Sequence, residues 1–203
     1  MIMQPLIYLA SQSPRRSELL QQIGIHFQVL LLRNDIHRPA DVDETPLPAE
    51  VPAAYVQRIC QAKVKAAWNA LLQRNWPKFP VLSADTTVVV DHKIIGKPPD
   101  RRDAATILHL LSGRKHQVLS AVAMMLDERV EMRLCTSDVT FAPLSEARIQ
   151  HYLDSDEAYD KAGAYAIQGL AGAFVQRIEG SYSAVVGLPL YETAELLQSF
   201  GYH

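Results

Sequence analysis

The sequence is short of cysteine and of long apolar runs. Its two cysteines, Cys60 and Cys135, form no CxxC spacing, which excludes a disulfide framework and is typical of a reducing compartment. No apolar run approaches the roughly 20 residues of a membrane helix, and Met1–Pro5 carries no basic residue ahead of the apolar run that follows. We therefore expect a cytoplasmic protein that is neither exported nor inserted into a membrane.

The sequence also lacks a charge excess and several familiar motifs. A formal net charge of −2 gives no global attraction to nucleic acid or to anionic lipid, so we expect neither as a partner. There is no GxxxxGK[ST], GxGxxG, GxSxG or HExxH pattern, which argues against P-loop, Rossmann, serine hydrolase and zinc peptidase sites. What is present is 203 residues with 48% hydrophobic content, enough for one large domain or two small lobes.

The most informative stretch is Val81–Asp100, which reads VLSADTTVVVDHKIIGKPPD. Its β-formers and the turn at Asp91 predict a hairpin. A carboxylate at Asp85, inside an apolar run, is costly to bury unless a metal, a cluster of donors or a cleft receives it. The alternative is that Asp85 caps a bulge or bonds to its own turn. Lys97, placed just beyond the second strand, favours a site that holds a metal and a phosphate.

A serine-rich turn near the start of the chain predicts a phosphate site. Leu6–Ala10 reads as a buried strand, Ser13 as a helix N-cap and Pro14 as the first helical residue. Arg15 and Arg16 then lie at the positive end of the helix dipole, where cations are unfavourable unless an anion binds. A solvated basic helix face is the alternative.

Three further segments hold candidate residues. Glu44 lies in an acidic loop that is either solvated or a set of metal ligands facing Asp85. Lys63 lies in the helical pattern 51–72 and alone is typical of a surface lysine. Five of the nine glycines fall between Gly163 and Gly187, which suggests tight turns or backbone close to a ligand. Gln168, beside them, could pair with the edge of a nucleobase; a glutamine on the surface is the alternative and the commoner case.

The remaining segments read as scaffold. We expect a strand over 27–32, a polar segment over 33–50, a helix over 101–111 capped by Asp100, strands over 116–126 and 130–141, a helix from Ser145 to Leu153, and a closing helix to Phe200 with Pro189 as its first residue. The residues alone therefore indicate a phosphate-handling enzyme. A nucleotide-binding regulator that uses the same pocket without turnover is the alternative.

Seven motifs, in order along nearly the whole chain, resemble those of the Maf family of nucleoside triphosphate pyrophosphatases. They are ASQSPRR (Ala10–Arg16), DET (Asp43–Thr45), AK (Ala62–Lys63), SADTTVV (Ser83–Val89), GKP (Gly96–Pro98), DKAGAYAIQG (Asp160–Gly169) and VVGLPL (Val185–Leu190). The resemblance implies a single domain over 1–203. Its fold would be α/β, like the inosine triphosphate pyrophosphatases, with a twisted mixed β-sheet, flanking helices and two lobes around a cleft.

The resemblance also implies an activity and a site. A nucleoside triphosphate would be hydrolysed to the monophosphate and pyrophosphate, with a divalent metal cation (Mg²⁺ or Mn²⁺), in a cytoplasmic homodimer. Matched position by position, Asp85 is the catalytic proton acceptor, and Glu44 with Asp85 binds the metal. The residues that hold the phosphates are Ser13, Arg16, Lys63 and Lys97.

Three positions distinguish branches of the family. Arg15, Thr86 and Gln168 are similar to the branch that hydrolyses dTTP and UTP, and the other branch, which acts on 7-methyl-GTP, tends to carry different residues there. A neutral amide at Gln168 suits uracil or thymine, whereas a carboxylate would suit a cationic methylated guanine. We expect dTTP and UTP as substrates, with related pyrimidine triphosphates as further candidates and 7-methyl-GTP as a poor one.

Overall fold

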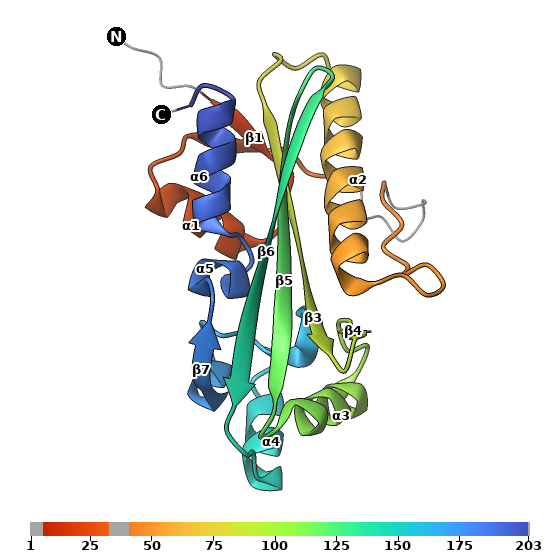
Figure 1. The fold of residues 1–203 in the computed structure, drawn as a ribbon, viewed down its shortest axis with the longest axis vertical. Helices are drawn as coiled ribbons and strands as arrows, with labels where there is room; N and C mark the ends of the chain where they lie inside the picture. Colours follow the sequence, from red (N-terminus) through yellow and green to blue (C-terminus); the bar gives the residue numbers. More distant parts are fainter. Residues whose placement is uncertain (1–5, 33–40, 203) are drawn as a thin grey trace.

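Three long antiparallel strands form the spine of the molecule (Figure 1). The computed structural model describes residues 6–32 and 41–202. The polar segment predicted over 33–50 therefore lies partly outside the described residues, and the first five residues lie wholly outside them. The spine consists of β3 (Val81–Val90), β5 (Lys115–Leu126) and β6 (Arg129–Phe141). Val and Leu side chains recur along β3 and β5 and are buried there, because helices cover both faces of these strands.

The sheet has seven strands and is mixed. Its order is β2-β1-β3-β5-β6-β7, with β4 paired to β3 outside this path. The first two strands run parallel to each other and to β3, and all other pairs are antiparallel. The shorter strands are β1 (Ile7–Leu9), β2 (Phe27–Val29), β4 (Lys93–Ile95) and β7 (Val175–Glu179).

One edge of β3 is interrupted, and this interruption positions the site. Along its other edge β3 pairs with β5 from Val81 to Val89. On the interrupted edge, β1 pairs only with Val81 and Leu82, and β4 pairs only with Val88 to Val90. On this edge alone, the stretch 83–87 between the two pairings has no strand beside it among the described residues. Asp85 and Thr86 therefore lie where the sheet opens.

The upper lobe, as drawn in Figure 1, packs helices on both faces of the sheet. Its helices are α1 (Pro14–Gln22), α2 (Pro52–Gln73), α5 (Tyr182–Val186) and α6 (Leu190–Ser199). On one face, Val64 and Trp68 of α2 pack with Val81 and Ala121. On the other face, helices α1 and α6 bury apolar side chains against Leu82 and Val122. These two residues directly follow Val81 and Ala121 along β3 and β5, so their side chains point to the opposite face of the sheet. This alternation is what a sheet covered on both faces requires.

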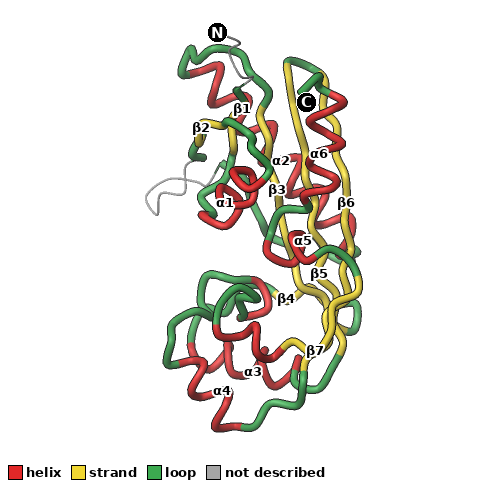
Figure 2. Tube along the Cα trace, turned by 90° about the vertical axis from the view of Figure 1, so that its left-hand side faces the viewer, coloured by secondary structure: helices red, strands yellow, loops and turns green. Residues whose placement is uncertain are grey.

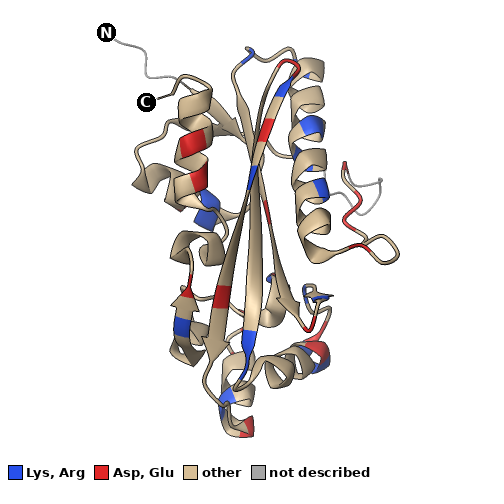
Figure 3. Ribbon diagram, in the orientation of Figure 1, with Lys and Arg blue, Asp and Glu red and all other residues tan. Residues whose placement is uncertain are grey.

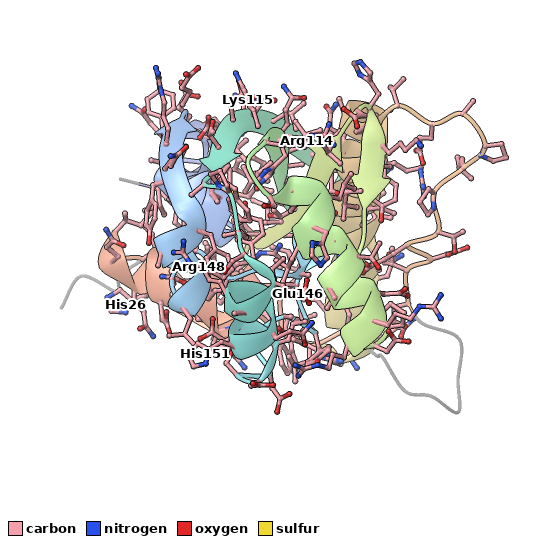
Figure 4. All side chains as sticks on the ribbon, turned by 90° about the horizontal axis from the view of Figure 1, so that it is seen from below. His26, Arg114, Lys115, Glu146, Arg148 and His151 are labelled. Atoms are coloured by element: carbon pink, nitrogen blue, oxygen red, sulfur yellow. The ribbon has the colours of Figure 1, made fainter. Side chains whose placement is uncertain are left out.

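The lower lobe packs around the other end of the spine. It contains α3 (Arg101–Leu111), α4 (Glu146–Leu153), β7 and two short 3₁₀ turns, Ala162–Ala164 and Leu170–Phe174. Figure 2 shows this lobe separated from α1 and α5 along the spine. Its core includes an aromatic cluster in which the rings of Phe141 and Tyr152 both meet Phe174 edge-on. Arg148 lies on α4 (Figure 4), and its guanidinium carbon is 5.0 Å from the centre of the Phe174 ring.

The structure confirms the mixed α/β fold and the predicted hairpin. Both predicted N-caps of the lower lobe are also confirmed, since Asp100 accepts from the amide of Asp103 at 2.9 Å and Ser145 accepts from the amide of Arg148 at 3.3 Å. Pro189 was assigned wrongly. It is the N-cap of α6 rather than its first helical residue, because its ψ of 102° is extended while its carbonyl already accepts the first helical bond.

Charges of both signs are scattered over both lobes (Figure 3). Within the described part of the chain, no helix combines the length and the apolar character needed to span a membrane.

Candidate active site

A cleft of about 1090 Å³ opens beside the interrupted edge of β3. Its walls come from the start of α1, the loop before α2, the middle of β3, the turn after β4 and the segment 160–168. Every residue singled out from the sequence lines this cleft: Ser13, Arg15, Arg16, Glu44, Lys63, Asp85, Thr86, Lys97 and Gln168. Residues up to 155 positions apart in the chain thus face one space.

Lys63 joins the two predicted carboxylates. Its Nζ lies 2.6 Å from Oδ1 of Asp85 and 2.8 Å from Oε1 of Glu44. Asp85 is only 7% exposed, so its charge needs this partner. Lys63 is therefore not the ordinary surface lysine that its helical position alone suggested, and the reading of Asp85 as the cap of a bulge is not supported.

The two carboxylates differ in their electrostatic environment. Burial raises the pKa of Asp85 above its ordinary value, and the positive charges of Lys63 and Arg16 offset this only in part. Burial also acts to raise the pKa of Glu44, but Lys63, Lys97 and Arg16 outweigh it and hold that pKa below its ordinary value. The cleft thus shifts the pKa values of these two acids in opposite directions.

Arg16 is held in place from two sides. Its Nε donates to the carbonyl of Gly187 at 2.8 Å, and its Nη1 donates to Oγ of Ser11 at 3.3 Å. Burial lowers the pKa of Arg16, while the negative charge of Asp85 opposes this shift. Because an arginine pKa is far above neutrality, the guanidinium stays charged and presents a fixed cation to the cleft.

The start of α1 faces the cleft without a side-chain cap. Ser13 is the N-cap, as predicted, but its side chain makes no capping hydrogen bond. No acidic residue lies in the first turn of α1, and Arg15 and Arg16 lie there instead. An anion bound at this turn would complete the cap and neutralise the two cations. Lys97 lines the same cleft and forms no salt bridge with any residue of 6–32 or 41–202.

The segment that carries Gln168 is fixed against the spine. Gly163, at φ 76°, packs so closely on β3 that a Cβ there would lie 2.8 Å from Cγ2 of Val88. At the other end, the Glu157 carboxylate accepts from the amide of Leu170 at 3.1 Å. Gln168 is therefore presented by backbone held on both sides, which is what recognition of a base edge requires.

The donor set of the cleft fits a hard divalent cation. No group of three His, Cys, Asp or Glu side chains within the described residues could hold a metal alone. Glu44 and Asp85, however, both reach one point, the Nζ of Lys63. Mg²⁺ is commonly bound by one or two carboxylates and completes its coordination with water and substrate phosphates. These two carboxylates suit that mode of binding.

Comparison with known proteins identifies the family. The family model for Maf-like proteins matches residues 6–200. The chain belongs to the Maf family. A curated relative from Nitrosomonas europaea, named dTTP/UTP pyrophosphatase, is 55% identical over 195 residues, which are 96% of this chain and 94% of the relative. A relative with the same name from Nitrosospira multiformis is 54% identical over 95% of this chain and 93% of its own length. Another from Aromatoleum aromaticum is 52% identical over 98% of this chain and 97% of its own length.

The fold of this Maf chain is also similar to a solved structure. The Staphylococcus aureus Ham1 protein superposes with a TM-score of 0.51 at 15% identity, covering 96% of this chain and 97% of that one. This likeness concerns the fold alone, and it confirms the architecture expected from the motifs.

Three features of the Maf cleft were not singled out from the sequence. They are the Ser11 hydroxyl and the Gly187 carbonyl, which hold Arg16, and the Glu157 carboxylate, which holds the segment after Gln168. Ser11 belongs to a motif that was noted for its other residues. The Gly187 contact spans 171 positions in the chain, and no local pattern predicts such a partner.

Proposed function

We propose that this Maf protein is a nucleoside triphosphate pyrophosphatase that hydrolyses dTTP and UTP to the nucleoside monophosphate and pyrophosphate. The observation that carries the proposal is a buried Asp85, bonded to Lys63 at 2.6 Å, in a cleft that Arg16 and Lys97 also line. The names of curated relatives that are 52% to 55% identical over nearly the whole chain support the substrates.

In the proposed reaction, water attacks the α-phosphorus and the bond between the α-phosphorus and the bridging oxygen breaks. Pyrophosphate leaves, and the proton of the water passes to Asp85. A carboxylate whose pKa is raised by burial suits this role, because a base works best when its pKa approaches the working pH. No covalent intermediate is needed, since phosphoryl transfer depends mainly on positioning and on charge stabilisation.

The phosphates are assigned to Ser13, Arg16, Lys63 and Lys97. The uncapped start of α1 and the fixed guanidinium of Arg16 lie at one wall of the cleft. Lys63 uses two of its three N–H donors on carboxylates, which leaves one for a phosphate oxygen.

We assign a divalent cation, Mg²⁺ or Mn²⁺, to Glu44 and Asp85. When bound, it would neutralise charge on the phosphates and polarise the phosphorus that is attacked. Glu44 suits this role because its surroundings favour its charged form and hold its pKa below its ordinary value.

The base is assigned to Arg15, Thr86 and Gln168. The amide of Gln168 offers both a donor and an acceptor, which matches the alternating carbonyl and N–H edge of uracil and thymine. We further propose that residues 1–203 act as one domain with two lobes, that the chain works as a homodimer, and that it is cytoplasmic. Light scattering across a range of protein concentrations would test the dimer.

The central test is pyrophosphate release from dTTP, UTP and 7-methyl-GTP, measured with Mg²⁺ and with a chelator. Catalytic, metal-dependent release from dTTP and UTP is expected, with 7-methyl-GTP much poorer because its edge leaves polar groups of the pocket unpaired. A nucleotide-binding regulator would instead show thermal stabilisation without release. If 7-methyl-GTP were turned over as well as dTTP, or Gln168→Glu left the preference unchanged, the assignment of the base-reading residues would be wrong.

A further inference from the structure

Thr86 and Ser120 form a cross-strand pair next to the cleft. They are direct register partners in the antiparallel pairing of β3 with β5, so their side chains lie on the same face of the sheet. Their hydroxyl oxygens are 2.9 Å apart. Thr86 lines the cleft, whereas Ser120 is completely buried behind it.

The hydrogen of the Ser120 hydroxyl is already committed. Ser120 Oγ lies 2.7 Å from the carbonyl oxygen of Ala184 in the short helix α5, and a carbonyl can only accept. Ala184 is fully buried and lies in the last turn of that helix, where carbonyls lack helical partners. Turning the Ser120 hydrogen toward Thr86 would leave this buried carbonyl unsatisfied, which is costly.

It follows that Thr86 is the donor in its bond with Ser120. The only other acceptor recorded for the Thr86 hydroxyl among the described residues is the carbonyl of Gly187, at a longer 3.5 Å. With its single hydrogen directed at Ser120, the Thr86 oxygen offers only lone pairs to the cleft. A phosphate oxygen carries no hydrogen to give, so the triphosphate does not suit this position.

We propose that Ser120 is a positioning residue, which orients the Thr86 hydroxyl so that its oxygen accepts a hydrogen bond from a donor on the nucleoside part of the substrate. The proposal rests on the proposed function and adds a residue and a direction of hydrogen bonding to it. The donor is either the imide N–H of uracil or thymine or a hydroxyl of the sugar, and these sources can be distinguished with substrate analogues.

The test measures kcat and KM for three pairs of substrates. In each pair the second substrate lacks one donor of the first. 3-Methyl-UTP lacks the imide N–H of UTP, dUTP lacks the 2′-hydroxyl of UTP, and 3′-deoxythymidine triphosphate lacks the 3′-hydroxyl of dTTP. The variants are Ser120→Ala, Thr86→Val and the double variant. Ser120→Cys serves as a second replacement. Its side chain is nearly the same size as that of serine, but its thiol is only a weak acceptor for the Thr86 hydroxyl.

The chain offers a matched control in Ser137. This serine is also completely buried in the sheet and also bonds to the backbone beside α5, donating to the carbonyl of Ser181 at 3.2 Å, but no bond to Thr86 is recorded. Ser137→Ala therefore loses a comparable buried hydroxyl without changing the direction in which the Thr86 hydroxyl donates its hydrogen bond.

We expect the wild type to prefer the donor-bearing substrate in one of the three pairs. Ser120→Ala and Ser120→Cys should reduce that preference about tenfold, mainly through KM, and Thr86→Val should reduce it at least as much. The double variant should behave like Thr86→Val alone, because Ser120 acts through Thr86. Ser137→Ala should lower the melting temperature but leave the preference unchanged.

Three results would overturn the inference while leaving the pyrophosphatase proposal standing. In the first, the wild type hydrolyses dTTP and UTP but shows no preference in any pair. In the second, the Ser120 variants keep the wild-type preference. In the third, Ser137→Ala loses the preference as much as the Ser120 variants do. Absence of pyrophosphate release by the wild type from dTTP and UTP would instead overturn the proposed function, and the inference with it.

Discussion

Asp85 and Glu44 share one lysine but are made chemically different by their surroundings. Both bond to Lys63, yet burial raises the pKa of Asp85, whereas the neighbouring cations hold the pKa of Glu44 down. Environments that shift the pKa values of two nearby acids in different directions are a common way to assign them different roles. The division that we propose is between a proton acceptor, Asp85, and a metal ligand, Glu44.

Replacing Asp85 by Asn should abolish turnover and leave the fold intact. The amide keeps the shape but can neither take the proton nor bind metal strongly, so kcat should fall by about 10³-fold or more with saturating Mg²⁺. A variant with near-normal kcat that melts cooperatively would contradict the role assigned to Asp85.

The same variant makes a prediction about stability and pH. Since the pKa of Asp85 is raised on folding, its contribution to stability is present below the ordinary aspartate pKa and is lost as the pH rises through the folded value. Asp85→Asn has no such loss. Its melting temperature relative to the wild type should therefore increase as the pH rises above the ordinary aspartate pKa of about 4, and a difference that stays constant from that pH upward would show that the Asp85 pKa is not raised.

At the level of single elements, the sequence predicted what local chemistry determines. The β3–β4 hairpin and the caps at Asp100 and Ser145 were predicted, because turn and cap residues act on their immediate neighbours. Strand β7 was missed, since Val175–Glu179 is short and mostly exposed and exists through its pairing with β6. The predicted strand over 27–32 ends at Val29.

Two helix N-caps in this chain have different tasks, and substitution should separate them. Asp100 accepts a hydrogen bond from the helix it caps, so Asp100→Ala should cost about 1 kcal/mol, or roughly 2 to 4 °C in melting temperature, with kcat/KM unchanged. Ser13 makes no such bond, so Ser13→Ala should lower kcat/KM with little change in melting temperature. The reverse pattern would remove Ser13 from the phosphate site.

The loop that carries Glu44 is clamped to α2. The hydroxyl of Tyr55 donates to the carbonyl of Glu44 at 2.9 Å, and Arg58 donates to the carbonyl of Thr45 at 3.0 Å. Tyr55→Phe removes one of these bonds without touching either carboxylate. The element α2 thus supplies Lys63 and also positions the partner of Lys63.

Loosening this clamp should weaken metal use more than nucleotide binding. We expect Tyr55→Phe to raise the Mg²⁺ concentration for half-maximal activity about threefold to tenfold, because one hydrogen bond is lost. Tyr191→Phe is the matched control, since within residues 6–32 and 41–202 the Tyr191 hydroxyl bonds only to Glu195, on the exposed side of α6. An equal effect of both variants would refute a role of the clamp in positioning Glu44.

At the scale of the whole molecule, the cleft takes its parts from both lobes. Arg16 belongs to a helix packed on the upper core, whereas Gln168 follows residues Ala164 and Tyr165 of the lower core. The family motifs placed every candidate residue in one cleft, which periodicity alone could not do. The contacts that hold them, such as Arg16 to Gly187, depend on the packing of distant segments and had no sequence signal.

A nucleotide that spans the cleft should stabilise the molecule through both lobes. In the inactive Asp85→Asn background, dTTP at about 100 times its Kd should raise the melting temperature by roughly 5 to 10 °C, since binding to the folded state alone contributes about 2.7 kcal/mol. Adding Gln168→Ala should reduce the shift with dTTP but not the shift with inorganic pyrophosphate, because only the nucleotide carries a base for Gln168 to bind. If Gln168→Ala reduced both shifts equally, Gln168 would not read the base.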